Sequence, residues 1–399
     1  MSAKTRKKVL FVVYSFIQAG GERYTYEIAQ ALNKDRYDVH FLKIYPLLFN
    51  KDWDTEYYYK PLLDAGFPIF FWEDILSNDK TYSTLQFIYK YFSKVLPSRV
   101  NAKLYHLIEN RKQELLNSFF SKYDIVNWMG IGIYTLLGLH LPPGCYTSYI
   151  HVLTTKFQYE NDCYEKWDKN KHYHFVTPFS HKLLLKEMED FKSYDSTYFP
   201  MSLTLTPFTV DASTKPSSIK TIAVFTRIDK MKPMEPYIYG LKLLREKGMD
   251  VQLFVYGAGN PQQTGLKRQI SHLYLDNFVH FKGHTASIEN TLKHDNLDLV
   301  WFQSGNNRPA GFAAFEIAMS GIPQVFWDFG NYEEDPEYNN IYPNFIHLSN
   351  FVNLTFDLLE APASAFELGQ KQQQFVLSNQ DIKKNINIIE KLFDESTNR

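Results

Sequence analysis

The chain has 399 residues, more than one hydrophobic core usually serves, so two domains of similar size are expected. Its 43 Lys and Arg residues nearly balance 44 Asp and Glu residues, which argues against nucleic acid as a partner. Two cysteines exclude a disulfide framework, and the apolar run Val9–Val13 is too short, and the basic segment before it too polar, for a signal peptide. With no run of 18 apolar residues to span a membrane, we expect a cytoplasmic protein.

The first half alternates short apolar runs with stretches of helical spacing. The strand at Val9–Val13 breaks at Ala19-Gly20-Gly21, and Glu22–Leu32 then has the apolar spacing of a helix. Four further strands are predicted, at Tyr37–Ile44, Phe67–Trp72, Asp124–Trp128 and Tyr146–Ile150. This alternation is typical of a parallel sheet with helical crossovers.

A basic, aromatic segment at residues 82–120 departs from this alternation. Between Thr81 and Lys112 it carries six Lys or Arg residues and one acidic residue, Glu109. Two interpretations are open: a pair of surface helices that contact anionic lipid or a lipid-linked acceptor, or a solvated basic face over an aromatic core. The first would make the protein peripheral at the inner face of the membrane.

A polar, turn-rich segment at Thr206–Lys220 predicts a linker, after which the alternation restarts. Strands and helices are predicted at Thr221–Phe225, Glu235–Glu246 (helix), Val251–Tyr256, Phe278–Phe281, Asp298–Phe302, Phe312–Met319 (helix) and Pro323–Trp327. Two doubly wound α/β domains facing across a cleft are therefore expected, with ligands beyond the carboxyl ends of the strands. We place the domains at 1–205 and 221–375, the linker at 206–220, and a C-terminal helix at 376–399 that packs back on the first domain.

Two cations follow the first strand of the second half. Arg227 and Lys232 stand five residues apart on the turn that leads to a helix. Fixed cations beside the amides of a helix N-terminus form a site for a diphosphate. Two solvated loop cations would show the same spacing.

The order of the motifs that follow is more specific. Tyr256-Gly257-Ala258-Gly259 comes after a strand, Val279-His280-Phe281-Lys282-Gly283-His284 about twenty residues later, and Pro309–Pro323 (PAGFAAFEIAMSGIP) after the next strand. Over residues 221–328 this ensemble resembles the donor domain of family 4 of the retaining glycosyltransferases, which have the GT-B fold. The turn at Gly20 and Gly21 is similar to the family's glycine turn, and His151 ends a strand as the family's cleft histidine does.

The resemblance implies a role for each matched residue. Arg227 and Lys232 would neutralise the diphosphate leaving group, Glu316 would accept hydrogen bonds from the ribose hydroxyls, and His151 would contact the donor sugar. The implied catalytic residues are Arg227, Lys232, Glu316 and His151. The implied donor-binding residues are Gly20, Gly21, Gly257, Gly283, His284, Asn307, Arg308, Gly311 and Phe312. No Asp-x-Asp motif is suitably placed, so neither a metal nor another cofactor is expected.

One position departs from the family in charge. Arg308 stands where the family has a glutamate that binds the hydroxyls of the donor sugar, and an arginine cannot accept a hydrogen bond. Three explanations remain open: a donor sugar that carries a carboxylate, compensation by Asn306, Asn307 or His151, or loss of transfer.

The predicted function is that of a retaining, metal-independent glycosyltransferase. It would move a sugar from a nucleotide-diphosphate donor, with UDP as the family's commonest nucleotide, to a saccharide, lipid-linked or protein acceptor. The alternative is a catalytically inactive GT-B protein that binds a nucleotide or a glycan as the partner of another transferase.

Overall fold

Two parallel β-sheets organise the computed structural model. The chain divides into one unit formed by Met1–Phe199 with Ile386–Arg399 and a second formed by Pro200–Asn385. The residues described are 6–44, 56–128, 146–151, 172–175, 192–193, 195–210, 219–229, 232–262, 264–304, 311–328 and 340–396.

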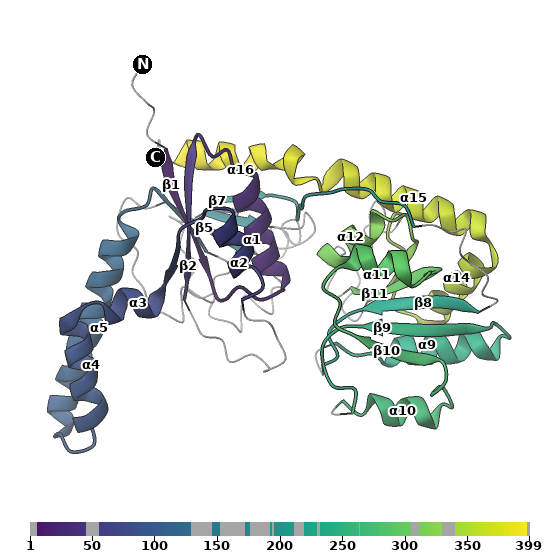
Figure 1. The fold of residues 1–399 in the computed structure, drawn as a ribbon, viewed down its shortest axis with the longest axis horizontal. Helices are drawn as coiled ribbons and strands as arrows, with labels where there is room; N and C mark the ends of the chain where they lie inside the picture. The colour runs from purple at the N-terminus through teal and green to yellow at the C-terminus, as the bar shows by residue number, and fades with distance from the viewer. Residues whose placement is uncertain are drawn as a thin grey trace. The chain divides into compact units, whose positions relative to one another are not determined.

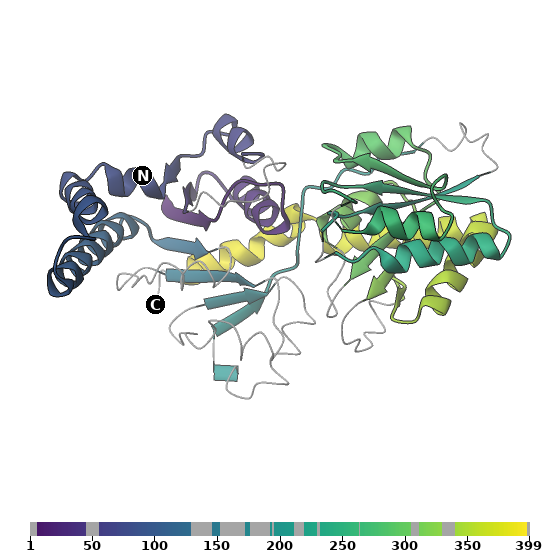
Figure 2. The same cartoon turned by 90° about the horizontal axis from the view of Figure 1, so that it is seen from below.

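The first unit holds a seven-stranded parallel sheet in the order β3-β2-β1-β4-β5-β6-β7. Its strands are β1 (Lys7–Val13), β2 (Tyr37–Lys43), β3 (Ile69–Phe71), β4 (Ile125–Trp128), β5 (Tyr146–His151), β6 (His172–Phe175) and β7 (Asp195–Tyr198). Its described helices are α1 (Gly20–Ala31), α2 (Tyr59–Asp64), α3 (Trp72–Ser77), α4 (Lys80–Phe92) and α5 (Ser98–Phe120). Figures 1 and 2 show that α4 and α5 form a hairpin that projects away from this sheet.

The central strand β1 explains why this sheet forms. Residues Val9–Val13 are almost fully buried, as is typical of a parallel strand covered on both faces. Val9 pairs with Val39 on one side and with Ile125 on the other. The predicted strands of this half are confirmed, while β6 and β7 were not predicted, since their sequences, HYHF and DSTY, contain no apolar run.

Helix α1 differs from the prediction at its start. We expected Gly20 and Gly21 to form a turn before a helix at Glu22, but they are the first two residues of the helix. Ala19 has an extended backbone, and its carbonyl already accepts the amide of Arg23 at 2.9 Å. The helix therefore begins two residues earlier, directly behind the carboxyl end of β1.

The second unit holds a six-stranded parallel sheet in the order β10-β9-β8-β11-β12-β13. Its strands are β8 (Lys220–Phe225), β9 (Val251–Tyr256), β10 (Val279–Gly283), β11 (Leu299–Ser304), β12 (Gln324–Asp328) and β13 (Asn344–Phe345). Its helices are α9 (Glu235–Glu246), α10 (Leu266–His272), α11 (Ile288–His294), α12 (Phe312–Ala318), α14 (Leu348–Glu360) and α15 (Pro362–Asn379). The predicted strands and helices of this half are confirmed to within two residues.

Both sheets reverse their strand order at their first strand. In the second unit β8 lies between β9 and β11, so the chain winds outward in both directions from β8. Loops that follow the two strands at such a switch point leave a crevice between them, because their crossover helices lie on opposite faces. The carboxyl ends of β8 and β11 therefore lie side by side at one edge of the sheet.

The core of the second unit is centred on Trp301. Its ring lies 5.0 Å from that of Phe351 between centroids, and its indole N–H donates to the Thr355 hydroxyl at 3.0 Å. A second buried polar contact involves Gln372, whose amide oxygen accepts from the Gln324 backbone at 2.9 Å. Its amide nitrogen donates to the carbonyls of Gln324 and Ile341, each at 2.9 Å. The Gln372 side chain of α15 thus connects β12 to the segment before β13 through hydrogen bonds.

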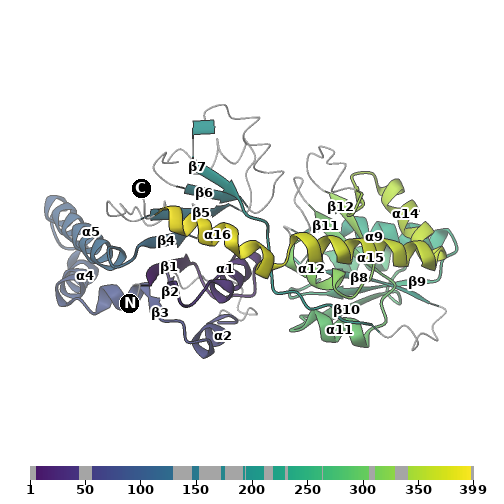
Figure 3. The ribbon, with the colours of Figure 1, turned by 90° about the horizontal axis from the view of Figure 1, so that it is seen from above.

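The C-terminal residues form two helices instead of one. Helix α15 ends at Asn379, and α16 (Ile382–Ser396) follows after a short break. Leu203 pairs with Asp381 at this break, within the second unit. Further along, Phe393 of α16 is fully buried in the first unit, where its ring lies 6.0 Å from that of Tyr37. Figure 3 shows α16 alongside the strands of the first unit.

The division between the units precedes the expected linker. Residues 200–205 belong to the second unit, and Leu203 is fully buried there. Phe208 also donates its amide to the Met319 carbonyl at 3.2 Å, so the expected linker is anchored at its start. None of the described helices combines the length and the apolar character needed to cross a membrane.

Candidate functional site

The loop after β8 carries the two predicted diphosphate ligands. Arg227 is exposed and lies just after the strand. Lys232 is half-buried and lies two residues before Met234, the N-cap of α9. The Nε atom of Arg227 lies 3.5 Å from the Asp229 carboxylate, and both side chains are more than a third exposed. Ion pairs of this kind contribute about 0–1 kcal/mol, so an anionic ligand can replace Asp229 as a partner of Arg227 at little cost.

The Gly257-Ala258-Gly259 segment packs directly against this loop. The Thr226 amide donates to the Tyr256 carbonyl at 2.9 Å, and the Ile228 amide donates to the Ala258 carbonyl at 2.8 Å. Both glycines have positive φ, 154° at Gly257 and 131° at Gly259. A Cβ atom would lie 1.7 Å from the Thr226 oxygen at the first and 2.2 Å from the Ile228 oxygen at the second. The glycine motif therefore fixes the position of the loop that carries Arg227.

The third motif continues the same edge of the sheet. The Gly257 amide donates to the Gly283 carbonyl at 2.8 Å, and Gly283 has φ 79° at the end of β10. His284 follows it and is exposed. Hydrogen bonds thus join the ends of β8, β9 and β10 into one backbone surface.

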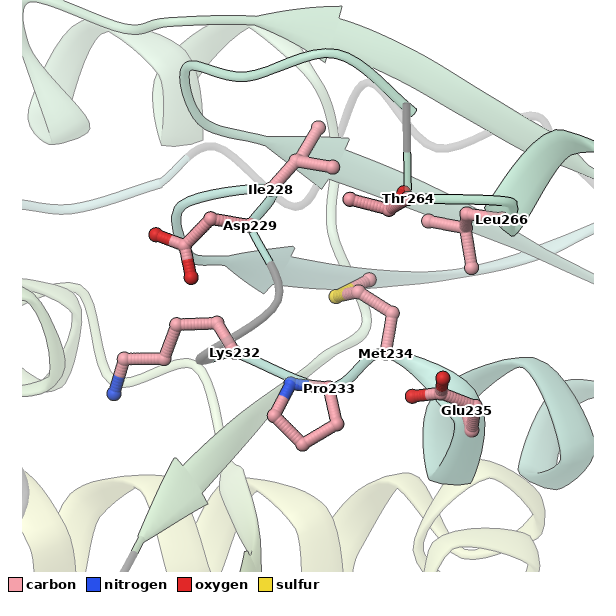
Figure 4. Close-up of a pocket in the computed structure, with 8 residues that line it drawn as sticks. All are labelled: Ile228, Asp229, Lys232, Pro233, Met234, Glu235, Thr264 and Leu266. Atoms are coloured by element: carbon pink, nitrogen blue, oxygen red, sulfur yellow. The ribbon is translucent and has the colours of Figure 1, made fainter. Parts of the chain in front are cut away.

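A small cavity opens beside the Arg227 loop. It measures about 150 Å³ and is lined by Ile228, Asp229, Lys232, Pro233, Met234, Glu235, Thr264 and Leu266. Figure 4 shows the Lys232 ammonium and the Asp229 carboxylate extending to the same side, with Met234 and Leu266 forming the apolar wall. Ligand pockets of whole cofactors usually measure about 300–1,000 Å³, so this cavity has the size for one part of a nucleotide sugar.

Helix α12 carries the predicted ribose ligand. Gly311 caps the helix in an extended conformation, and no heavy atom of the residues that the structure describes lies within 4 Å of where its Cβ would be. Phe312 is buried at the first helical position, and Glu316 is half-buried one turn later. Because α12 follows β11, the neighbour of β8, Gly311 and Arg227 both belong to the switch point of this sheet.

The predicted site residues Asn307, Arg308 and His151 have side chains outside the part of the chain that the structure describes. Asn307 and Arg308, with Asn306, lie outside the described residues. His151 is the last residue of β5, as predicted, and its side chain lies outside the described part. Among the described residues, no three His, Cys, Asp or Glu side chains gather as metal ligands would.

Glu22 was not singled out in the sequence. It lies in the first turn of α1, only 7% exposed, and its carboxylate accepts from the Ser15 hydroxyl at 3.3 Å. Burial raises the pKa of Glu22 from 4.5 to about 7, although the helix amide and Ser15 oppose this. An acidic residue in the first turn of a helix is usually an exposed one, so the sequence carries no signal for this buried carboxyl.

Comparison with known proteins gives a likeness of structure only. No protein-family model matches the sequence, and no curated protein matches it. The chain resembles HepE of Anabaena solved with UDP and glucose, at 14% identity and a TM-score of 0.65, with 98% of this chain and 100% of that chain covered.

Two further solved structures are similar to the same extent. The sucrose-phosphate synthase of Thermosynechococcus elongatus is 13% identical, with a TM-score of 0.64 over 98% of this chain and 99% of that one. The pneumococcal O-GlcNAc transferase GtfA, solved with UDP and GlcNAc, is 11% identical, with a TM-score of 0.64 and the same coverage. Together with the two Rossmann-like sheets, these likenesses show that the chain has the GT-B fold.

Proposed function

We propose that this chain is a glycosyltransferase that uses a nucleotide-diphosphate sugar, with UDP as the nucleotide. The single observation that carries this is the joined edge of β8, β9 and β10, where the glycine segment fixes the start of the loop that carries Arg227 and Lys232. Structures of the same fold with bound UDP support the choice of ligand. Two cations on one loop at this edge suit an anion that carries two phosphates.

The proposed chemistry is transfer with retention and without a metal. Cleavage of the bond between sugar and phosphate leaves negative charge on the nucleoside diphosphate, and Arg227 and Lys232 would stabilise that charge as it develops. Glu316 would accept hydrogen bonds from the ribose, and the departing phosphate would assist deprotonation of the acceptor. Turnover that is unchanged by a chelator would support the metal-independent form, whereas loss of turnover that Mg²⁺ or Mn²⁺ restores would contradict it.

The nucleotide is tested by thermal shift. We expect UDP and UDP-sugars to raise the melting temperature more than GDP, ADP and their sugars, because a ligand that binds only the folded state stabilises it. A larger shift with GDP or ADP would replace the proposed nucleotide. No shift with any nucleotide diphosphate would contradict a donor site in this domain.

We predict that Arg227→Ala weakens UDP binding about 10- to 100-fold, since a hydrogen bond to a charged group contributes about 1.5–3 kcal/mol. Isothermal titration with UDP measures the change. Lys371→Ala is the matched control, because Lys371 is an exposed cation on α15 of the same unit. Unchanged UDP affinity in Arg227→Ala, with an intact melting temperature, would show that Arg227 is not a ligand.

A catalytically inactive GT-B protein is the second candidate, and Arg308 favours it. An arginine in place of a sugar-binding glutamate leaves the nucleotide part of the site intact and changes only the sugar part. The two candidates differ in turnover. Tight UDP binding without hydrolysis or transfer from any UDP-sugar, including sugars with a carboxylate, would establish the second.

A further inference from the structure

The end of the α4–α5 hairpin exposes apolar side chains. We define the hairpin tip as residues 87–107, where α4 ends, the chain turns, and α5 begins. Its most exposed apolar side chains are Phe87 (58%), Tyr91 (60%), Val95 (76%) and Leu107 (54%). Single exposed apolar residues are ordinary, but several on one projecting tip mark an interaction surface.

Side-chain contacts between the two helices hold the hairpin together at its base and at its turn. At its base, Asp79 caps α4 by accepting the Tyr82 amide at 2.7 Å, and the same carboxylate binds the Arg111 guanidinium at 2.7 and 3.2 Å. At its turn, the Asn101 side chain donates to the Ser93 carbonyl. These contacts join α4 to α5 at both ends, so the tip is presented in a fixed form.

The side chains that the hairpin buries are different from the exposed ones at its tip. Leu104 and Ile108 are the buried residues of α5 in this part, whereas α4 has no buried residue. Phe87 and Tyr91, both exposed on α4, contact each other with ring centroids 4.7 Å apart and ring planes tilted by 47°. The exposed aromatic pair is thus not used to close the hairpin itself.

The charge of the tip is of one sign. Four exposed cations lie on it, Lys90, Lys94, Arg99 and Lys103, and the sequence has no Asp or Glu between Lys80 and Ile108. No carboxylate of the described residues lies within 4.0 Å of these four. The other two cations of the segment, Arg111 and Lys112, lie nearer the base and pair with acidic residues.

We propose that the hairpin tip docks on an anionic lipid bilayer. Aromatic and aliphatic side chains enter the region between headgroups and acyl chains, while Lys and Arg side chains beside them reach the anionic headgroups. The exposed side chains lie on both helices and on the turn between them, so they surround a convex end, which a fluid bilayer can accommodate. An acidic protein would need a socket shaped to this convex end, whereas a bilayer needs none.

Vesicle binding of the full chain tests this proposal. We expect the protein to bind vesicles in which about a third of the lipid is phosphatidylglycerol, and to bind pure phosphatidylcholine vesicles far more weakly. Co-sedimentation in the absence of nucleotide sugar is the measurement. Equal binding to both kinds of vesicle, or binding to neither, would overturn the proposal. Because no turnover is measured, the result is independent of the proposed transferase activity.

Two sets of substitutions distinguish the contribution of the tip cations from that of the apolar side chains that enter the bilayer. Changing Lys90, Lys94, Arg99 and Lys103 together to Gln is expected to weaken binding to anionic vesicles more than about 100-fold, since each cation contributes about fivefold. Changing Phe87, Tyr91 and Val95 together to Ser is expected to leave a weak binding that high salt abolishes. All seven side chains are exposed, so the melting temperature should not change.

The matched controls lie on α15 and α16, with Phe366→Ser for the apolar set and Lys371→Gln with Lys383→Gln for the charged set. These side chains are also exposed, Phe366 by 66%, and they lie outside the hairpin. They should bind vesicles as the unchanged protein does. Undiminished binding in the four-cation variant, or an equal loss in the controls, would show that the tip is not the docking surface.

Discussion

At the scale of single residues, Glu22 stands out because a buried carboxyl is normally paired with a cation. Its described partners are a helix amide and the Ser15 hydroxyl, neutral groups that offset its burial only in part. The carboxyl therefore takes up a proton near neutral pH in the folded chain, and in the unfolded chain it does so only near pH 4.5. Between pH 4.5 and about pH 7, folding is therefore accompanied by the uptake of a proton at Glu22.

Stability of the first unit should fall as the pH rises from about 4.5 to 7, because the folded state binds more protons than the unfolded state over that range. Glu22→Gln keeps the shape and removes the charge, so it should remove this fall. The gain above pH 7 is about 3 kcal/mol, or roughly 6–12 °C in melting temperature. Melting curves at pH 5 and pH 8 measure it, with the exposed Glu73→Gln as control. Parallel curves for the unchanged protein and Glu22→Gln would contradict the burial of the charge.

At the scale of elements, the contact between two loops decides the shape of the candidate site. After β8, the amides of Thr226 and Ile228 donate to the carbonyls of Tyr256 and Ala258, and these hydrogen bonds continue the pairing of β8 with β9. A side chain on either glycine of the Gly257–Gly259 segment would separate the two loops. The glycines are thus required by the approach of another loop, apart from any contact with a ligand.

Gly257→Ala should lower stability by at least about 2 kcal/mol, because it combines a positive φ with a Cβ atom 1.7 Å from the Thr226 oxygen. Gly311→Ala is the matched control, since its Cβ would meet no atom of the described part of the chain within 4 Å. That control should change the melting temperature little. An equal, small effect of both substitutions on thermal unfolding would mean that the two loops do not pack as closely as described.

At the scale of the whole molecule, α16 belongs to both units. Its first residues, up to Asn385, are part of the second unit, and the residues from Ile386 onward are part of the first. In the first unit Arg36 pairs with Glu390 and Asp394, and the Tyr37 hydroxyl donates to the Glu390 carbonyl at 3.0 Å. These polar contacts surround the buried ring of Phe393.

Phe393→Ala should destabilise the first unit by about 3–5 kcal/mol, the usual cost of removing a buried phenyl ring. Lys391 lies on the same helix with a side chain that is 77% exposed, so Lys391→Ala should change the stability little. Urea unfolding followed by circular dichroism measures both. A first unit that unfolds at the same urea concentration in Phe393→Ala would show that α16 is not part of its core.

Much of the fold could be predicted from sequence because its signals are local. Helix α9 and strand β9 have the predicted bounds, since Pro236 and the glycines at 248 and 257 mark their ends. The two-residue strand β13 and the polar strand β7 were missed, because they are held by neighbouring strands and not by their own apolar pattern. In the site, Arg227 and Lys232 could be found by spacing, whereas the packing of Gly257 against Thr226 depends on a contact 31 residues apart along the chain.

The two crossings of the chain between units have a consequence for synthesis. The second unit is one continuous stretch, Pro200–Asn385, while the first is made of two pieces that flank it. Domains usually fold in the order in which the ribosome delivers them. Here the first unit is synthesised first but is completed by α16, which is synthesised last. The surface of β1 and β2 that Phe393 covers in the finished chain therefore stays exposed until the second unit has been made. A chaperone or a partner that covers this surface would act on the growing chain and have no site on the finished one.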